Sequence, residues 1–335
     1  MITLISSVFV FLIVVMIHEF GHFTVAKLSG IQVNEFSIGM GPSIYQNKNG
    51  ETKYSIRALP IGGYVAMEGE EEHSNNPRSF NNANILKRIA VVVAGATMNF
   101  ILGFVAFTLI FAIIGYPSNK VDNIIEGSPA YQAGIKKGDI ITEINGHRVS
   151  DLKDLNYIIQ SSKANSVEIK VSRNNEIKIV NLKPKFSIEN DRYLIGITTE
   201  LEKSFIKSIE YGFSRTIEMV MAILSSLKMM ITGSFKMEYL SGPVGVVQII
   251  GSESSKGFLN FLQILGLISV NLGVFNLLPI PALDGGKLLF LIIEAIIGRP
   301  INEKVEQILT IFGISLLFSL MIYVTIFNDI GRLFK

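Results

Sequence analysis

Four stretches of the chain are apolar and almost free of charged residues. The first runs from Ile2 to Ile17 and, beyond one short polar motif, continues apolar to Ala26. The others run from Ile89 to Asn119, from Gly257 to Leu283 and from Gln307 to Asn328. A helix needs about 20 apolar residues to cross the ~30 Å hydrocarbon core of a bilayer. The pattern therefore predicts four membrane-spanning helices.

The first stretch could be confused with the hydrophobic region of a secretory signal peptide. It has no basic residues before it and no small-residue cleavage site after it. It runs directly into the motif from His18 to His22. We therefore expect a retained membrane helix.

Basic residues in the short loops predict how these helices are oriented. The link between the first two spans carries Lys48, Lys53, Arg57, Arg78, Lys87 and Arg88. The link before the last span carries Arg299 and Lys304, and no basic residue precedes Lys27. Because basic loops stay in the cytoplasm, we expect both links inside, and both termini and the segment from Lys120 to Ser255 outside.

This long segment is rich in charged residues, Gly and Asn, which indicates an inserted soluble domain. Residues 166–172 and 176–182 alternate apolar and polar side chains around Asn174-Asn175, which is typical of a β-hairpin. Further on, apolar residues recur every three or four positions from Ile206 to Ile231, with charged residues between them. This pattern predicts an amphipathic helix that lies against the membrane or the protein rather than a fifth span.

We thus expect a membrane α-helical fold with an inserted extracytoplasmic α+β domain. Its four parts would be residues 1–118 with the first two membrane helices, 119–202 with the inserted domain, 203–256 with the amphipathic helix and a connector, and 257–335 with the last two membrane helices.

Composition limits both the class of protein and the residues that could bind a metal. Hydrophobic residues make up 49% of the chain and charged residues 17%, which argues against an ordinary soluble enzyme. The 30 Lys and Arg nearly balance the 28 Asp and Glu, so no overall field would attract nucleic acid. There is no cysteine, so any bound metal must use His, Asp or Glu.

The motif at the end of the first span is the strongest chemical signal. His18 and His22 are four residues apart, so a helix places both imidazoles on one face, where they could bind one zinc ion beside Glu19. A chance occurrence or a pair of histidines that cap a helix end would be the alternatives. Three ionisable groups in an apolar span are costly, which favours the metal site.

A catalytic zinc needs a third protein ligand. The other histidines, His73 and His147, lie outside the apolar stretches, so a carboxylate is the better candidate. Asp284 follows a break made by Pro279 and Pro281 in the third span, and irregular backbone at membrane depth is tolerated only where protein or a wet cavity satisfies it. Asp284 could also simply mark a helix end at the membrane interface.

Taken together, these segments resemble the site-2 protease family of intramembrane zinc metalloproteases, and most closely the bacterial regulator-of-sigma-E type. The matching motifs are HEFGH at residues 18–22, GGYV at 62–65, LSGPVG at 240–245, SVNLG at 269–273 and NLLPIPALDGG at 276–286. The resemblance implies that His18, His22 and Asp284 bind Zn²⁺, that Glu19 is the catalytic base, and that Asn276 holds substrate.

The inserted domain resembles a single PDZ domain through its EGSPA, AGI, GDII and ING motifs between residues 126 and 146. PDZ domains bind extended peptides by strand addition, although a role as spacer or steric lid is an alternative.

A hairpin is predicted after the first span, with strands at residues 43–46 and 52–60 joined by residues 47–50. It resembles the family's membrane-reentrant β-loop, whose edge would pair with an unwound substrate. A plain cytoplasmic hairpin is the alternative. Asn99 and Asn271 could be polar contacts between helices.

The resemblance implies a multi-pass enzyme of the cell membrane that cleaves single-span membrane proteins near the cytoplasmic face. Its substrates would be anti-sigma factors and remnant signal peptides, with no nucleic acid partner. The alternatives are a non-proteolytic pseudoprotease that binds membrane proteins and a metal transporter. The intact Glu19 argues against the first, and the lack of visible inverted repeats argues against the second.

Overall fold

The computed structural model of the chain describes residues 2–70, 74–189, 191–234 and 240–331. The chain forms two compact units. One comprises Met1–Ile110 with Gly212–Lys335, and the other comprises Phe111–Tyr211. His73, which the sequence excludes as a ligand, lies outside the described residues.

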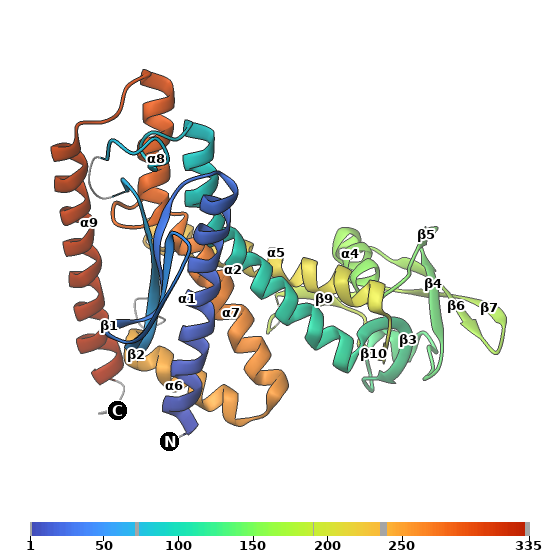
Figure 1. Cartoon of the computed structure of the whole chain (residues 1–335). Helices are drawn as coiled ribbons and strands as arrows, with labels where there is room; N and C mark the ends of the chain where they lie inside the picture. The colour runs from blue at the N-terminus through green and yellow to red at the C-terminus, as the bar shows by residue number, and fades with distance from the viewer. Residues whose placement is uncertain (1, 71–73, 190, 235–239, 332–335) are drawn as a thin grey trace. The chain divides into compact units, whose positions relative to one another are not determined.

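The first unit is mostly helical (Figure 1). Its helices are α1 (Ile2–Leu28), α2 (Ile85–Ile114), α5 (Phe205–Ile231), α6 (Pro243–Ser255), α7 (Phe258–Asn276), α8 (Asp284–Ile297) and α9 (Glu303–Val324), with a π-helical turn at Thr325–Ile330. Helices α2 and α5 extend into the second unit. Four segments are long and apolar enough to cross a membrane, namely Thr3–Leu28, Ile85–Ile114, Phe258–Asn276 and Lys304–Ile330. Each of the four predicted spans thus corresponds to one such helix, and α5 is not one of them. The second helix ends at Ile114 rather than Asn119, and the third ends at Asn276 rather than Leu283.

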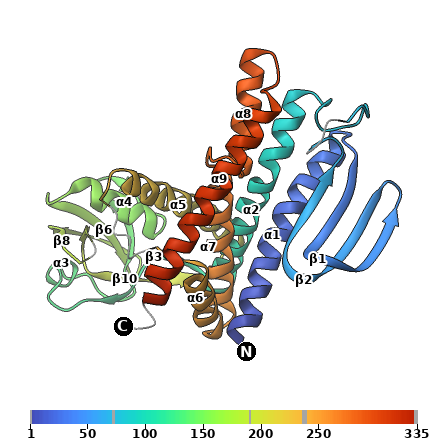
Figure 2. The ribbon, with the colours of Figure 1, turned by 90° about the vertical axis from the view of Figure 1, so that its left-hand side faces the viewer.

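Helix α1 packs closely against α2, α6 and α7 (Figure 2). Gly21 of α1 faces the backbone of Ala94 on α2, where an added Cβ would lie 2.4 Å from the carbonyl oxygen. The two helices therefore touch backbone to backbone at the level of the HEFGH motif, a contact that the missing side chain of glycine permits.

Strands β1 (Val33–Asn49) and β2 (Thr52–Met67) form a long antiparallel hairpin. Phe36 pairs with Val65 on one side and with Tyr54 on the other, so the start of β1 lies between the two halves of β2. Among the described pairings, Tyr64 pairs only with Ser37, so the second half of β2 forms an edge.

This hairpin is longer than the sequence pattern indicates. We expected strands at residues 43–46 and 52–60 around a four-residue loop, but β1 begins at Val33 and pairs as far as Asn49. Side chains alternate between buried and partly buried from Val33 to Gly39 and are exposed from Met40 onward. The prediction therefore found part of the exposed outer half and missed the inner half, where Val33–Gly39 pairs with the second half of β2.

A break separates α7 from α8. Residues 277–283 leave helical geometry, Pro281 has no N–H to donate, and Ala282 has a φ of 85°. Gly285 packs so closely on this break that an added Cβ would lie 2.1 Å from the carbonyl oxygen of Leu278. The break thus folds back on the start of α8, which carries Asp284 in its first turn.

The second unit is an α+β domain. Its elements are β3 (Tyr116–Ile124), α3 (Pro129–Gln132), β4 (Ile140–Ile144), β5 (His147–Arg148), α4 (Leu152–Ser162), β6 (Val167–Arg173), β7 (Glu176–Leu182), β8 (Lys185–Ser187), β9 (Arg192–Leu194) and β10 (Ile197–Glu202). The main sheet has the order β10-β3-β4-β6-β7, with β5 paired to β4. Strands β6 and β7 confirm the predicted hairpin, and Asn174 and Asn175 have the positive φ values of its turn.

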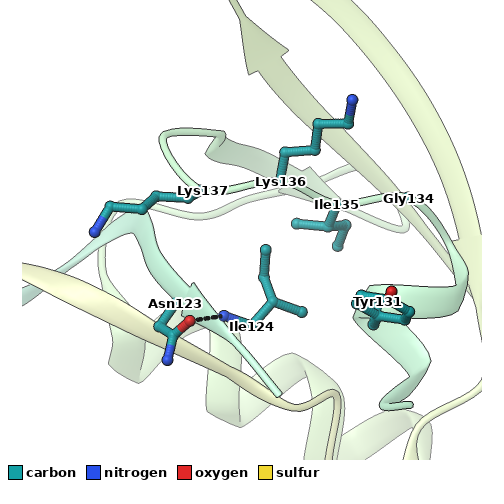
Figure 3. A pocket seen from close by; sticks show the side chains of 7 residues that line it. All are labelled: Asn123, Ile124, Tyr131, Gly134, Ile135, Lys136 and Lys137. Atoms are coloured by element: carbon teal, nitrogen blue, oxygen red, sulfur yellow. Dashed lines mark hydrogen bonds between the residues drawn. The ribbon is translucent and has the colours of Figure 1, made fainter. Parts of the chain in front are cut away.

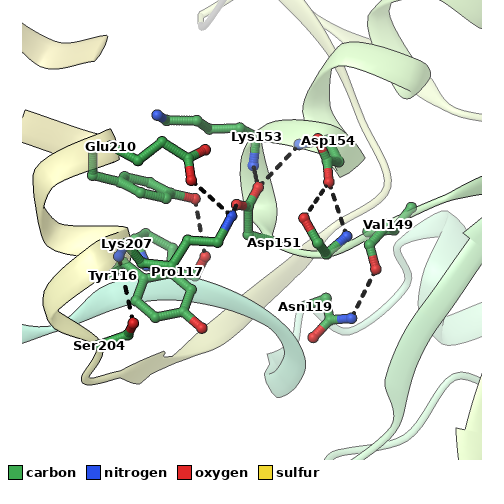
Figure 4. A network of polar contacts seen from close by, with 12 residues as sticks. Tyr116, Pro117, Asn119, Val149, Asp151, Lys153, Asp154, Ser204, Lys207 and Glu210 are labelled. Carbon is green, nitrogen blue, oxygen red and sulfur yellow. Dashed lines mark hydrogen bonds and ion pairs between the residues drawn. The ribbon is translucent and has the colours of Figure 1, made fainter. Parts of the chain in front are cut away.

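A polar network ties α4 to the start of α5 within this unit (Figure 4). Asp151 caps α4, because its Oδ1 accepts hydrogen bonds from the backbone N–H groups of Lys153 and Asp154. Its Oδ2 lies 2.8 Å from the Lys207 ammonium of α5. Although burial opposes the Asp151 carboxylate, these partners lower its pKa.

Candidate metal centre

The two histidines of the HEFGH motif lie on one face of α1. They are 6% and 9% exposed, and their Nε2 atoms are 3.1 Å apart. Helix α1 is otherwise apolar along most of its length. The helix thus presents two imidazole nitrogens toward a single point.

Asp284 completes a cluster of three ligand atoms. Its Oδ2 lies 3.1 Å from His18 Nε2 and 3.4 Å from His22 Nε2. Among the described residues, these three form a group of His, Asp or Glu close enough to hold a metal ion. The structure therefore brings together the three side chains that the sequence nominated.

The donor set and its spacing fit zinc. A tetrahedral Zn²⁺ with bonds of about 2.0–2.1 Å places neighbouring ligands roughly 3.3 Å apart. The Asp284 Oδ2 atom is buried and has no hydrogen-bond partner among the described residues. A buried oxygen without a donor, aimed at two imidazole nitrogens, is a group that a bound cation would satisfy.

Helix α2 forms one wall of this cluster. At Gly95 an added Cβ would lie 2.4 Å from His22 Nε2 and 2.7 Å from His18 Cε1. The backbone carbonyl of Val91 lies 2.8 Å from His22 Nδ1 and can only accept, so that nitrogen carries the proton. The lone pair of neutral His22 is then on Nε2, the atom that faces Asp284.

Glu19 lies next to the cluster on α1. Its carboxyl group has electrostatic interactions with His18, His22 and Asp284. Its Cγ also lies 3.7 Å from the position of a Cβ at Gly63 on β2. The second half of β2 therefore passes directly beside Glu19.

Two asparagines contact His18. The Nδ2 atom of Asn276, at the end of α7, lies 3.3 Å from His18 Nε2, so Asn276 belongs to the site. Asn99 of α2 lies on the other side of the ring, near Nδ1. Asn99 was expected only as a polar contact between helices, and Gly95 was not predicted to be part of the site. Their only sequence signal was a polar residue and a small residue one turn apart within an uncharged span.

The second unit holds a separate hollow of about 340 Å³ (Figure 3). Ile124, Ile135 and Tyr131 are among the residues that line it. Lys137 at the rim forms an ion pair with Asp122, 2.8 Å apart. His147 is exposed on β5 of the same unit and is not part of the metal cluster. The three candidate metal ligands therefore all lie in the first unit.

Comparison with known proteins identifies the family. The fold and the site are those of a membrane-embedded metallopeptidase. A family model described as Peptidase family M50 matches residues 6–320. The chain belongs to this family.

Its relatives match over nearly the whole chain. A Clostridium acetobutylicum protein is 39% identical over 325 residues, which cover 96% of each chain. The regulator of sigma-W protease RasP of Bacillus subtilis is 31% identical over 418 residues and 99% of each chain. The zinc metalloprotease RasP of Bacillus licheniformis is 30% identical over 417 residues and 99% of each chain. Family and relatives agree with the ligand set: the chain is a zinc metalloprotease of the membrane.

Among solved structures, the chain is similar to the PDZ domain of an SdrC-like protein from Listeria innocua, with 29% identity and a TM-score of 0.23. That match covers 25% of this chain and 96% of the domain.

Proposed function

We propose that this chain is an intramembrane endopeptidase, which cleaves peptide bonds in or near the membrane-spanning segments of single-span proteins. The observation that supports this most is the position of the ligand cluster. His18 and His22 lie within an apolar helix long enough to span a membrane, and Asp284 follows the break after another. A protease site within the membrane-spanning helices acts on substrates that are themselves in the bilayer.

We assign the zinc ligands as His18 Nε2, His22 Nε2 and Asp284 Oδ2. Zinc bound by three protein ligands acidifies a water molecule and polarises a carbonyl group. Glu19 is the general base: its carboxylate takes a proton from the attacking water and delivers it to the nitrogen of the departing amine.

Substrate unwinding is the second requirement of this reaction. A helical substrate must open several backbone hydrogen bonds, and each unpaired group costs several kcal/mol in hydrocarbon. The edge formed by the second half of β2 supplies replacement partners beside Glu19. Exposed Ile44, Ile56 and Leu59 suit insertion of this hairpin into the membrane. Asn276, next to His18, holds the peptide near the scissile bond.

The remaining parts control access. The division into residues 1–118, 119–202, 203–256 and 257–335 stands as our proposal for the functional parts. The second unit, as a PDZ-like domain outside the cell, and the amphipathic α5 exclude proteins with bulky external domains. The catalytic cluster then lies toward the cytoplasmic side, with both termini outside. The sigma-W regulator among the relatives favours anti-sigma factors as substrates, with remnant signal peptides as a second class.

A reconstituted cleavage assay tests the proposal. Purified protein in liposomes should cleave a single-span substrate within or next to its membrane segment, and Glu19→Gln should abolish cleavage while it keeps bound zinc. Glu218→Gln is the matched control, because Glu218 is exposed on α5 and forms an ion pair with nearby Arg215. Equal cleavage by parent and Glu19→Gln would refute the proposal, and cleavage confined to soluble loops would refute its intramembrane part.

A further inference from the structure

Asn99 lies against the zinc ligand His18 in a way that the proposed chemistry does not yet use. It is fully buried on α2, and its Nδ2 atom lies 3.2 Å from His18 Nδ1. Its Oδ1 atom is buried without a hydrogen-bond partner among the described residues. A buried amide oxygen that lacks a hydrogen-bond donor, on a side chain in contact with the imidazole, indicates that Asn99 interacts with the ring through this oxygen.

The proton of His18 decides which end of the amide faces the ring. The ligand nitrogen of His18 is Nε2, which faces Asp284 and His22. A nitrogen that binds a metal has no proton, so neutral His18 carries its proton on Nδ1. An Nδ1–H group facing an Asn NH₂ group would be a contact between two donors.

Rotation of the amide by 180° resolves this conflict. The oxygen and the NH₂ group of an asparagine are nearly the same size, so the side chain fits in either orientation. With Oδ1 toward the ring, the unpartnered oxygen accepts a hydrogen bond from His18 Nδ1–H.

We infer that Asn99 is a positioning residue of the zinc centre: its Oδ1 accepts the Nδ1–H of His18 and so fixes the tautomer and ring orientation in which Nε2 binds zinc. The carbonyl of Val91 does the same for His22, at 2.8 Å. Both outer partners come from α2, so this helix orients both imidazoles. The inference rests on the proposed zinc ligands and goes beyond them.

The neighbourhood of Asn99 holds it in place. Its backbone carbonyl accepts a hydrogen bond from Ser269 Oγ of α7, at 2.8 Å, and Ser269 is fully buried. The hydrogen bond of Ser269 goes to the backbone of Asn99 and not to its side-chain amide, which makes Ser269→Ala a matched control for disturbed packing.

Zinc affinity of the purified full-length protein, measured by chelator competition in detergent, tests this assignment. Asn99→Leu keeps the shape of the side chain and removes the acceptor, so it should weaken zinc binding by about 10- to 100-fold. Asn99→Asp keeps an acceptor and should retain the parent's affinity, because carboxylates are common partners of metal-binding histidines. Ser269→Ala should also bind as the parent does.

A second measurement separates lost orientation from lost folding. The melting temperature of each metal-free variant should match that of the parent, while the rise on zinc addition should be smaller for Asn99→Leu alone. Parent-like zinc affinity in Asn99→Leu, or equal loss in Asn99→Asp and Asn99→Leu, would overturn the assignment and leave the ligands intact. Failure of the parent itself to bind zinc would overturn the centre and this inference with it.

Discussion

Arg88 of α2 and Glu294 of α8 form an ion pair at 2.7 Å, although 206 residues separate them in the chain. Their side chains are 12% and 18% exposed. Helix α2 carries the wall of the metal cluster, and α8 begins at Asp284. The pair therefore fixes the far end of α8 on the helix that orients the histidines, and so helps to keep Asp284 beside them.

Removing one partner of this pair should destabilise the protein. Arg88→Met leaves the Glu294 carboxylate without its cation, which costs about 3–5 kcal/mol when the site is buried. The double variant Arg88→Met with Glu294→Leu removes both charges and should recover much of that loss. Thermal unfolding in detergent measures it, with Arg215→Met as control, because the exposed pair of Arg215 with Glu218 contributes under about 1 kcal/mol. A double variant less stable than Arg88→Met would contradict this account.

Gly95→Ala should disable the metal centre. The new methyl group would occupy the space beside His22 Nε2 and push both imidazoles away from Asp284. We expect zinc affinity at least about tenfold weaker, and a parallel loss of activity, because outer-sphere changes alone cost this much. Gly331→Ala is the control, since Gly331 is helical and has open space around it. Full zinc occupancy in purified Gly95→Ala would show that the cluster yields to the methyl group.

The predictions from sequence succeeded where one physical requirement acts on many residues. A membrane span needs a long uncharged run, and all four spans were evident for that reason. The spacing of His18 and His22 is a local property of a helix. The position of Asp284 beside them depends on the fold-back at residues 277–283, to which the prolines pointed without giving its direction.

Contacts between distant segments were beyond the sequence pattern. Nothing near Arg88 or Glu294 in the chain indicates that they pair, and Asn99 reads as a generic polar contact between helices until His18 is placed beside it. The β1–β2 hairpin was predicted too short mainly at its inner end, where Val33–Gly39 pairs with the second half of β2, which lies far along the chain. These features depend on tertiary packing, which one sequence does not reveal.

Asn276→Leu should separate substrate binding from metal binding. If Asn276 holds the peptide near the scissile bond, its loss should lower the cleavage rate by about 10²- to 10³-fold, as for other groups that stabilise a reacting carbonyl. Zinc content, measured by atomic absorption, should stay at the parent's level, because the three ligand atoms remain. A loss of zinc equal to the loss of activity would instead make Asn276 part of the metal-binding set.

The edge of β2 should matter most for substrates that must be unwound. Successive N–H groups of a strand point to opposite sides, so Val65→Pro and Ala66→Pro remove one N–H that faces β1 and one that faces the edge. The edge-facing variant should slow cleavage of a helical substrate by about tenfold and affect a helix-destabilised substrate much less. Tyr45→Pro is the control, because Tyr45 lies in the end segment of β1, which pairs with the first half of β2 and not with its second half. Equal slowing of both substrates would remove strand pairing from the mechanism.

The Asp151 network should make the second unit sensitive to acid. Burial opposes the charged form of the Asp151 carboxyl group, but Lys207 and two backbone N–H groups lower its pKa in the folded state. A carboxyl whose pKa is lower in the folded state adds stability above its unfolded pKa of about 3.9, and that stability is lost as the pH falls through the folded value. Asp151→Asn keeps a capping side chain but loses the charge that pairs with Lys207. Hydrogen exchange of the full-length protein, corrected for intrinsic rates, should show lower protection of α4 in this variant near neutral pH and a smaller further loss below about pH 4. An unchanged acid response would mean that another carboxyl controls the unit, and Asp139, paired with Arg173, would be the next to test.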